Sequence, residues 1–556
     1  MTANWHGPDG DRRAARGETS AAPMRRQAPP PSPAGARRRL LGLLICALLA
    51  APPAATACPA HQRQLLAADR AALKARLEGL AVPGKPLVVA GPAAEVGRWG
   101  PVEDWPVTPI HSVLLPTGEV LAYSYPYENP RGSDATLWDP RSGTFTPVDM
   151  ERDLFCSGHS LLPDGRLFAS GGNNPVGCEF RGTADAHLFD PRRRRWTRLE
   201  DMAVGRWYPT NVALGDGRVV ITAGLGDDCE PTPVMELYTP GEGIEVVRGG
   251  RRELALYPRL FLLSSGLIAH VGPEADTWTF DLESERWQHV THSRFYRWDG
   301  SAVLVPGRTD EVLAVGGGDP PVAGAERIDF GAAAPRWRPT ASLNLARAHH
   351  DLVILPDRTV LAVGGGLDGL YGDPVFVPEL YDPEAETWTL LPPHALGRMY
   401  HSTSVLLPDG RVLVAGQDDG LSTFTAELYQ PAYLFRGPRP QIAGAPGLIG
   451  YGSSFTLTSP QAAEIAAVSL VAPSSVTHSV NVGQRLVDLP FVRAGGERLR
   501  VTGPVGPNHA PPGYYMLFLL DGDGVPSVAA WLRLAPGAVF GDGFEGGRLS
   551  AWSRAD

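Results

Sequence analysis

The chain has 556 residues and a formal net charge of -10 at pH 7, with 50 Lys and Arg against 60 Asp and Glu. The charge is spread along the sequence, which argues against a nucleic-acid-binding surface. With 64 Gly, 54 Pro and only 8% aromatic residues, the composition favours a turn-rich β protein over a helical one. No apolar run reaches membrane-spanning length, so we expect no transmembrane segment.

The first 57 residues have the pattern of a targeting segment. A basic stretch (37–39) precedes an apolar run (40–51), and small residues at 55–57 provide a cleavage site before Cys58. The basic flank argues against the alternative of a buried helix. We therefore interpret residues 1–57 as a leader with a signal peptide, and expect a secreted, periplasmic or cell-envelope protein. Cys58 at the new N-terminus would permit a lipid anchor, although Ala55 stands where Leu is usual.

Residues 58–94 predict a short helical segment, because leucines from Leu66 to Leu80 fall roughly on one face before Pro83-Gly84 ends the helix. Nothing in this segment carries chemistry, and we assign it a packing or spacer role. At the other end of the chain, residues 538–556 form a short Gly-rich tail whose role the sequence does not reveal.

A hairpin unit recurs about every fifty residues between residues 95 and 437. Each copy joins an apolar run to a second one through a turn that is most often Asp-Gly, which predicts a β-hairpin. The first strands of the copies begin near Ser112, Ser160, Asn211, Leu260, Ala302, Leu352 and Ser404. This period, together with Gly-Gly pairs at the ends of several copies, is typical of a kelch-type β-propeller.

Most units continue with a strand centred on tryptophan, at Trp196, Trp287, Trp337 and Trp388. The seventh unit has no such strand, but Trp99 lies in a spare one before the first unit. We predict that this N-terminal strand completes the seventh blade, which closes the ring and removes its open edge. The sequence thus predicts a seven-bladed propeller over residues 95–437.

Residues 438–537 follow a different pattern, with short strands separated by Gly and Pro turns. Such strands are expected near 455–458, 468–471, 499–501, 515–518 and 531–534. They predict an immunoglobulin-like β-sandwich. The complete fold is expected to be all-β, with a seven-bladed kelch-type propeller followed by this C-terminal sandwich.

Equivalent positions in three repeats carry residues that bind metals. Counting eight residues back from the turn aspartates (164, 216 and 409) reaches Cys156, Tyr208 and His401, and Tyr400 lies beside the last. The first strand of each propeller blade lines the central channel, so these side chains are expected to converge at one end of the channel. Phenolate oxygens and imidazole nitrogens suit Cu(II), and a bound metal would hold a phenol as phenolate at neutral pH.

Other residues fit the same geometry. Tyr257 stands eight residues before the turn residue Ser265, and His349 stands at that offset from Asp357, so either could be a ligand. His478 offers a further imidazole on an expected loop of the C-terminal domain. Aromatic and polar residues also fill propeller channels without binding metal, and the repeats alone do not separate these interpretations.

Four segments resemble the ligand segments of the radical-copper oxidases, the family that includes galactose oxidase and glyoxal oxidase. The segments are Phe155-Cys156, Arg206-Trp207-Tyr208, Arg398-Met399-Tyr400-His401 and Thr477-His478-Ser479-Val480. The resemblance extends from about residue 97 to residue 536 with the segments in the family's order, and residues 513–518 and 525–528 are similar to its C-terminal domain. It implies a propeller followed by a sandwich, with a sandwich loop that carries His478 into the channel.

The resemblance implies a role for each of these residues. Tyr208 would be the equatorial tyrosine joined by a thioether to Cys156, and this modified tyrosine would carry a radical. Tyr400 would be the axial tyrosine, which accepts the substrate's proton as general base. Tyr257 and His349 would then be channel lining. The ligands of one copper ion would be Tyr208, Tyr400, His401 and His478.

The implied reaction is the oxidation of a small aldehyde or primary alcohol, with O2 reduced to H2O2. Galactose oxidase covers its modified tyrosine with a Trp from the loop after that blade's hairpin, whereas the corresponding loop here, 224–228, contains no aromatic residue. Trp207, directly before Tyr208, is instead similar to glyoxal oxidase and favours small substrates. The resemblance also implies substrate contacts for Arg347 and Trp207. The alternative is a non-catalytic kelch propeller that binds a protein or a glycan, and copper content and peroxide production separate the two.

The cysteines agree with export. Cys178 and Cys229 fall in comparable loops of adjacent blades, and they are expected to form a disulfide in an oxidising compartment. The alternative is two unpaired loop thiols. We expect the protein to be a monomer.

Overall fold

The computed structural model describes residues 89–126, 132–174, 180–368, 370, 372–417 and 424–537. The expected leader and signal peptide, Cys58, the helix predicted before Pro83 and the tail 538–556 lie outside these ranges. Inside them the chain is almost entirely β-strand, with one α-helical turn, α3 (Ala93–Val96), and two 3₁₀ turns, η1 (Arg248–Gly250) and η2 (Ala432–Phe435). No helix in the described ranges is long and apolar enough to cross a membrane.

Seven antiparallel sheets, each built on four strands, form the propeller within the described residues, and this confirms the predicted fold. Blades 1 and 2 comprise β3 (His111–Leu114), β4 (Val120–Tyr123), β5 (Ala135–Asp139) and β6 (Thr144–Pro147), then β7 (Gly158–Leu161), β8 (Leu167–Ser170), β9 (Ala186–Asp190) and β10 (Arg195–Arg198). Blades 3 and 4 comprise β11 (Thr210–Ala213), β12 (Val219–Thr222), β13 (Met235–Thr239) and β14 (Gly243–Val247), then β15 (Leu260–Leu262), β16 (Ile268–His270), β17 (Asp276–Asp281) and β18 (Arg286–His292).

The remaining blades follow the same order. Blade 5 comprises β19 (Ser301–Leu304), β20 (Glu311–Val315), β21 (Ala325–Asp329) and β22 (Trp337–Pro339). Blade 6 comprises β23 (Ala348–Ile354), β24 (Val360–Asp368), β26 (Glu379–Asp382) and β27 (Thr387–Leu390), with the short β25 (Gly372–Pro374) beside β24. Blade 7 takes β28 (Ser402–Leu406), β29 (Val412–Gly416) and β30 (Thr425–Gln430) from this part of the chain.

The Asp-Gly signature of the repeats forms the turn of the inner hairpins. In blade 2 the N–H of Gly165 donates to the carbonyl oxygen of Leu162 at 2.9 Å, and the Asp164 carboxylate accepts the N–H two residues on at 3.0 Å. Gly165 has a φ of 88°, a left-handed conformation that glycine adopts more easily than other residues. The same contacts occur around Asp216 and Asp409. This is why the signature identified the hairpins.

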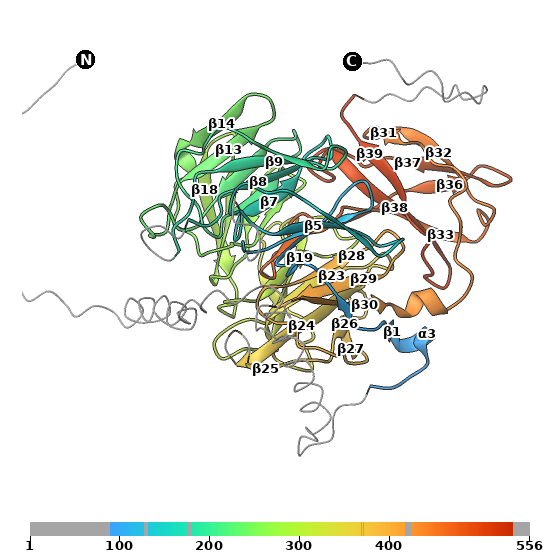
Figure 1. Cartoon of the computed structure of the whole chain (residues 1–556). Helices are drawn as coiled ribbons and strands as arrows, with labels where there is room; N and C mark the ends of the chain where they lie inside the picture. Colours follow the sequence, from blue (N-terminus) through green and yellow to red (C-terminus); the bar gives the residue numbers. More distant parts are fainter. Residues whose placement is uncertain are drawn as a thin grey trace, which may run out of the picture. The chain divides into compact units, whose positions relative to one another are not determined.

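The ring closes as predicted through the N-terminal strand. β1 (Arg98–Trp99) pairs with β30 as the outermost strand of blade 7, and β2 (Glu103–Asp104) pairs with the other end of β30. Figure 1 shows the blue β1 beside β30. The indole N–H of Trp99 donates at 2.8 Å to the carbonyl oxygen of Pro392, after the last strand of blade 6, and Trp388 makes the equivalent bond to blade 5 at 2.8 Å. Trp99 thus takes the place of the tryptophan that the seventh unit lacks.

Buried arginine–glutamate ion pairs connect the start of an inner strand to the third strand of the same blade. The arginine precedes the inner strand and the glutamate lies on the third strand of the sheet. The pairs are Arg206–Glu236, Arg297–Glu326, Arg347–Glu379 and Arg398–Glu427, at 2.6, 2.9, 2.7 and 3.3 Å. A buried charge is costly unless it is paired, so loss of one partner in such a pair is strongly destabilising.

The C-terminal domain is the expected sandwich of two sheets, ordered β31-β39-β38-β33-β35 and β32-β37-β36. Leu457 and Val501 of the smaller sheet share one apolar core with Val468 and Leu517 of the larger. The strands are β31 (Leu448–Ile449), β32 (Ser454–Thr458), β33 (Ile465–Val471), β35 (Leu486–Asp488), β36 (Phe491–Arg493), β37 (Arg498–Thr502), β38 (Gly513–Asp521) and β39 (Ala530–Leu534).

A hairpin of the C-terminal domain joins the propeller. β34 (Ser475–Thr477) pairs antiparallel with the inner strand β3 and so extends the sheet of blade 1. His478 and Ser479 form a two-residue turn, in which the N–H of Val480 donates to the carbonyl oxygen of Thr477 at 2.8 Å. Both turn residues are left-handed, with φ of 48° and 62°, as a type I′ turn requires. This hairpin places His478 at the inner edge of the propeller.

Candidate metal centre

Residues at the shared repeat position adopt one backbone conformation. Cys156, Tyr208, Tyr257, His349 and His401 have φ of 62°, 65°, 46°, 57° and 68°. The left-handed region is unfavourable for residues that carry a Cβ, and such residues concentrate at functional sites. The blades therefore repeat this strained conformation at the position that the sequence singled out, whichever side chain occupies it.

A thiol, two phenols and two imidazoles converge from three blades and the sandwich hairpin. The Cys156 sulfur and one ring nitrogen each of His401 and His478 lie within 4.8 Å of one another, and all three residues are buried. The phenol oxygens of Tyr208 and Tyr400 are hydrogen-bonded to each other. The centroid of the His478 ring lies 4.6 Å from that of Tyr208 and 4.5 Å from that of His401. Two imidazoles beside two phenols are a donor set that suits Cu(II).

The hairpin determines which nitrogen His478 presents to the rest of the cluster. The Thr477 hydroxyl donates to the carbonyl oxygen of Ile110 at 3.0 Å, so its oxygen accepts the Nδ1–H of His478 at 2.5 Å. Nε2 then carries the lone pair that a metal requires, and it lies 3.6 Å from the Cys156 sulfur. Burial and the neighbouring histidines hold the pKa of His478 well below its usual value, which keeps the ring neutral.

His401 has a partner that the sequence analysis did not identify. The Tyr125 oxygen lies 3.3 Å from Nδ1 of His401, and the His401 ring stacks on Tyr400 with centroids 3.7 Å apart and 27° between the planes. With Nδ1–H donating to Tyr125, the lone pair of His401 is on Nε2, as for His478. Tyr125 belongs to blade 1, whose repeat position is Pro109 and offers no ligand, so the repeat register did not reveal this residue.

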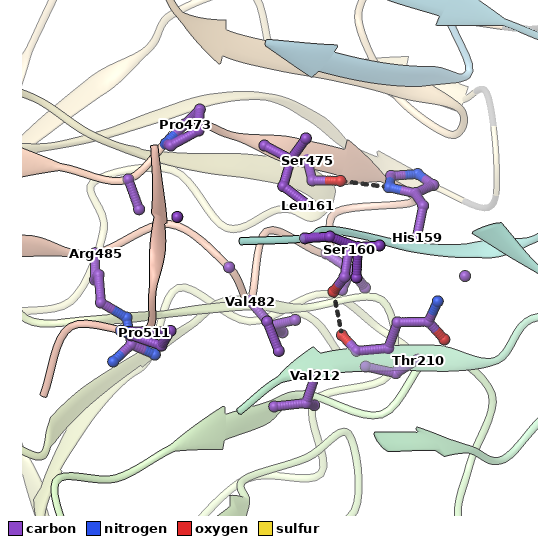
Figure 2. A pocket seen from close by; sticks show the side chains of 18 of the residues that line it. His159, Ser160, Leu161, Thr210, Val212, Pro473, Ser475, Val482, Arg485 and Pro511 are labelled. Atoms are coloured by element: carbon purple, nitrogen blue, oxygen red, sulfur yellow. Dashed lines mark hydrogen bonds between the residues drawn. The ribbon is translucent and has the colours of Figure 1, made fainter. Parts of the chain in front are cut away.

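Two further histidines connect Cys156 to the sandwich hairpin. The Cys156 N–H donates to His111 Nε2 at 3.0 Å, so His111 carries its proton on Nδ1, which faces His159 Nε2 at 3.1 Å. His159 Nδ1 lies 2.5 Å from the Ser475 hydroxyl of β34 (Figure 2). Burial lowers the pKa of His159 to about 3 and that of His111 well below its usual value, so both rings are neutral, as this chain of single protons requires. The chain ties the strained Cys156 backbone to the hairpin that carries His478.

The Tyr208 phenol needs a cation nearby to ionise. Burial raises the pKa of Tyr208 well above its usual value, and Cys156 and Tyr400 add to the effect. The site therefore does not create a phenolate by itself, and a bound metal must displace the proton and balance the charge. This requirement fits Cu(II), which binds oxygen and imidazole donors tightly.

Trp207 packs against the tyrosine that follows it. Its ring centroid lies 3.6 Å from that of Tyr208, at 79° between the planes, and 4.8 Å from that of Phe180. The backbone of Trp207 pairs with Leu225, in the loop that lacks an aromatic residue, through two hydrogen bonds of 2.8 Å. Only 3% of Trp207 is exposed, so it shields Tyr208 from solvent. Its contact with a substrate stays a prediction.

The structure places Arg347, for which a substrate contact was predicted, inside blade 6. This side chain is 0% exposed, and it donates to Glu379 at 2.7 Å and to the carbonyl oxygens of Gly364 and Val377 at 3.1 and 3.0 Å. These contacts form the arginine–glutamate pair of blade 6 and leave the guanidinium inside the blade. An arginine before an inner strand has this structural role in other blades too, so the geometry favours a structural role, and contact of Arg347 with a substrate stays a prediction.

An Arg347→Ala variant should lose stability rather than substrate affinity. Removing one partner of a buried ion pair costs about 3–5 kcal/mol, so the free energy of unfolding in urea should fall by that amount. KM of the remaining folded enzyme should not change. Arg297→Ala breaks the equivalent pair of blade 5 and is the matched control, with the same expected loss. A raised KM at native stability for Arg347→Ala alone would support the predicted substrate contact.

Tyr257 and His349 stand beside the cluster, as expected for channel lining. The Tyr257 hydroxyl donates to the carbonyl oxygen of Ser157 at 3.0 Å. His349 Nε2 lies 3.5 Å from a carboxylate oxygen of Asp299, and the His349 ring centroid is 5.3 Å from that of Tyr400. Among the described residues, His349 is not part of the group of mutually close nitrogen and sulfur atoms. Its exclusion from the ligand set stays a prediction.

The fold and the site together define a class of protein: a propeller whose channel holds a buried tyrosine, histidine and cysteine cluster that a sandwich hairpin completes. Residues 132–432 match the family model for the glyoxal oxidase N-terminus, and residues 439–534 match the galactose oxidase-like, Early set domain. The chain therefore belongs to the radical-copper oxidase family of galactose oxidase and glyoxal oxidase.

Similar proteins include several oxidases. The chain is 29% identical over 497 residues to the galactose oxidase of Gibberella zeae, covering 80% of this chain and 71% of that protein. It is 31% identical over 461 residues to the aldehyde oxidase GLOX of Vitis pseudoreticulata, covering 72% of this chain and 86% of that one. A solved fungal alcohol oxidase in complex with copper shares the fold, with a TM-score of 0.72 at 24% identity over 79% of this chain and 100% of that chain.

Proposed function

We propose that this chain is a copper-radical oxidase that acts on small aldehydes or primary alcohols, with a Cys156–Tyr208 thioether as its radical site. The observation that carries the proposal is the convergence of two phenols and two imidazoles beside the buried Cys156. The relatives named galactose oxidase and aldehyde oxidase support the reaction class. The alternative is a propeller that binds a partner and catalyses no reaction, and it does not account for this buried set of metal-binding side chains.

The reaction takes two electrons and two protons from the substrate, and O2 accepts both as H2O2. When bound, copper supplies one electron acceptor and orients the substrate oxygen, and the Tyr208 radical supplies the second. The protein's own groups do the rest. His401 and His478 would present their lone pairs on Nε2, and the Tyr400 oxygen, in contact with that of Tyr208, would take the substrate's hydroxyl proton. An aldehyde would react as its hydrate, which offers the same O–H and C–H bonds.

The thioether would join the Cys156 sulfur to a ring carbon of Tyr208 beside its hydroxyl. The S–H and C–H bonds are lost, and the two protons and two electrons go to O2 as H2O2. The two segments are held together by the Tyr208 N–H, which donates to the Cys156 carbonyl oxygen at 2.9 Å. Both side chains belong to one buried apolar cluster, and Cys156 is not in a disulfide, so its thiol is available for this bond.

Export forms part of the proposal. Residues 37–57 supply the signal pattern, and Cys229 is disulfide-bonded, which suits an oxidising compartment. Cys178, its predicted partner, lies outside the described residues. Sequencing the mature N-terminus checks the proposal, and a chain that retains the apolar run at 40–51 would contradict it.

Small aldehydes such as glyoxal or methylglyoxal should outperform galactose as substrates. Trp207 is buried against Tyr208, and the paired loop around Leu225 adds no aromatic ring, so a sugar gains little stacking. We expect kcat/KM for the best aldehyde to exceed that for galactose by roughly tenfold or more, with primary alcohols between. Peroxide formation measured over a panel of aldehydes, alcohols and sugars decides this. Galactose turning over faster than every aldehyde would mean that another residue provides the stacking surface.

The oxidase proposal itself is tested by copper loading. The metal-free chain should produce no peroxide with any member of that panel, and loading with one equivalent of Cu(II) in air should start peroxide formation. A chain that binds no copper, or that stays inactive with copper bound, would favour the binding propeller instead.

A further inference from the structure

The outer edge of blade 4 carries a second cluster of metal-binding side chains. Asp276 on β17 and His289 and His292 on β18 have ligand atoms that lie within 4.8 Å of one another. Asp276 Oδ1 is 2.5 Å from His292 Nδ1 and 3.4 Å from His289 Nε2. The side chains of Asp276, His289 and His292 are 50%, 37% and 68% exposed, so this cluster opens to solvent, unlike the buried centre.

A β-bulge brings the two histidines together. Residues three apart on a regular strand point to opposite faces of the sheet, which would separate His289 from His292. Here the register shifts, so that His292 pairs with Asp276 while His289 pairs with Trp278, and Val290 has no partner residue across the ladder. The extra residue returns His289 to the face that carries Asp276 and His292. Bulges often re-aim side chains in this way beside functional sites.

We propose that Asp276, His289 and His292 form a surface site for a divalent transition metal, Cu(II) or Zn(II), separate from the buried centre. Two imidazoles and one carboxylate suit both ions, and water would fill the remaining positions. With bonds of about 2.0–2.1 Å, the ligand atoms of a tetrahedral site lie about 3.3 Å apart. The 3.4 Å between Asp276 and His289 fits this value. His292 needs to withdraw by less than about 1 Å, which an exposed side chain can do by rotation.

A positive charge beside the cluster opposes a cation. The Arg252 guanidinium lies 3.4 Å from the ring centroid of Trp278, and it interacts electrostatically with Asp276. The Asp276 carboxylate offsets this positive charge, so it is needed both as a ligand and for charge balance. Trp278 in turn reports on the site, because its ring centroid is 4.8 Å from that of His289, and Cu(II) bound there would quench its fluorescence.

Metal stoichiometry of the full chain tests the proposal. Equilibrium dialysis at micromolar free Cu(II) should give two equivalents for the native protein and one for His289→Ala/His292→Ala, whose oxidase activity should be unchanged. Zn(II) at the same concentration should bind to the native chain. The double variant should bind one equivalent of Zn(II) less than the native chain. His478→Ala should still bind one equivalent of metal at the surface site. The experiment therefore distinguishes loss of metal binding at the buried centre from loss of metal binding at this site.

Matched controls use the same hairpin. Asp276→Asn should lower the affinity of the surface site for the metal by at least about tenfold. Asp281→Asn should leave it unchanged, because Asp281 bonds Ser284 at the far end of the β17–β18 hairpin. The part of the copper-dependent quenching that the double variant lacks should also be lost in Trp278→Phe. Equal metal content and affinity in the native chain and the double variant would overturn the proposal, and so would binding only at millimolar metal, which would mark an adventitious ion only.

Discussion

Replacing Tyr208 with phenylalanine should abolish peroxide formation while the chain still folds. The variant loses the predicted radical site and a predicted copper ligand together. It keeps the ring that packs at centroid distances of 3.6 Å against Trp207 and 4.5 Å against Tyr257. We expect kcat/KM for the best aldehyde to fall by at least roughly 10³-fold, measured as initial peroxide production after copper loading.

The neighbouring phenol provides the matched control for this substitution. Tyr257 has the same repeat position and is also buried, and its hydroxyl donates to the Ser157 carbonyl oxygen at 3.0 Å. Tyr257→Phe should cost about 1 kcal/mol of stability and retain most of the activity. If Tyr208→Phe kept as much activity as Tyr257→Phe, Tyr208 could not carry the radical.

Removing the imidazole of His478 should have the second-largest effect. His478→Ala deletes a predicted copper ligand, which the hairpin holds with Nε2 toward Cys156, and copper affinity should fall at least about 100-fold with most turnover lost. The fold should survive, because the hairpin is paired with β3 through Ser475, Val476 and Thr477. His478→Asn should give the same loss with an unstrained turn, since Asn readily adopts the left-handed φ of 48° found here. Copper titration of the metal-free chain measures the affinity.

Two neighbours of His478 sharpen this test. Thr477→Val keeps the imidazole but removes the oxygen that accepts its Nδ1–H, and copper affinity should fall by about 10–100-fold. His349→Ala should leave the affinity unchanged. Should copper stoichiometry and turnover both survive in His478→Ala but not in His349→Ala, His349 would be the ligand instead.

The propeller was predictable because each part of it has a local cause. The turn at Asp164 and Gly165 closes its own hairpin, so the Asp-Gly signature marks every blade in which it occurs. Trp99 identified the closing strand because an unpaired seventh blade would leave an open sheet edge. Counting eight residues back from the turn identified Cys156, Tyr208 and His401, because in each blade this spacing leads from the hairpin turn to the same strained backbone position.

The parts that sequence analysis missed depend on contacts between distant segments. The type I′ turn at His478 and Ser479 has neither Asn nor Gly, so the sequence predicted a loop where the structure has a hairpin. Tyr125 and His111 meet the site only after blades 1, 2 and 7 and the sandwich have assembled. The substrate contact predicted for Arg347 came from the family resemblance, and the sequence did not reveal that Arg347 pairs with Glu379 on another strand of the same blade.

Peptide mass spectrometry of the active, copper-loaded enzyme tests the central claim most directly. After exposure to copper and oxygen, the peptides that contain Cys156 and Tyr208 should appear as one crosslinked pair that lacks two hydrogens relative to the sum of the separate peptides. The same chain kept without copper should give the two peptides separately. Active, copper-loaded enzyme in which Cys156 is alkylated in full and the Tyr208 peptide is unmodified would contradict the account.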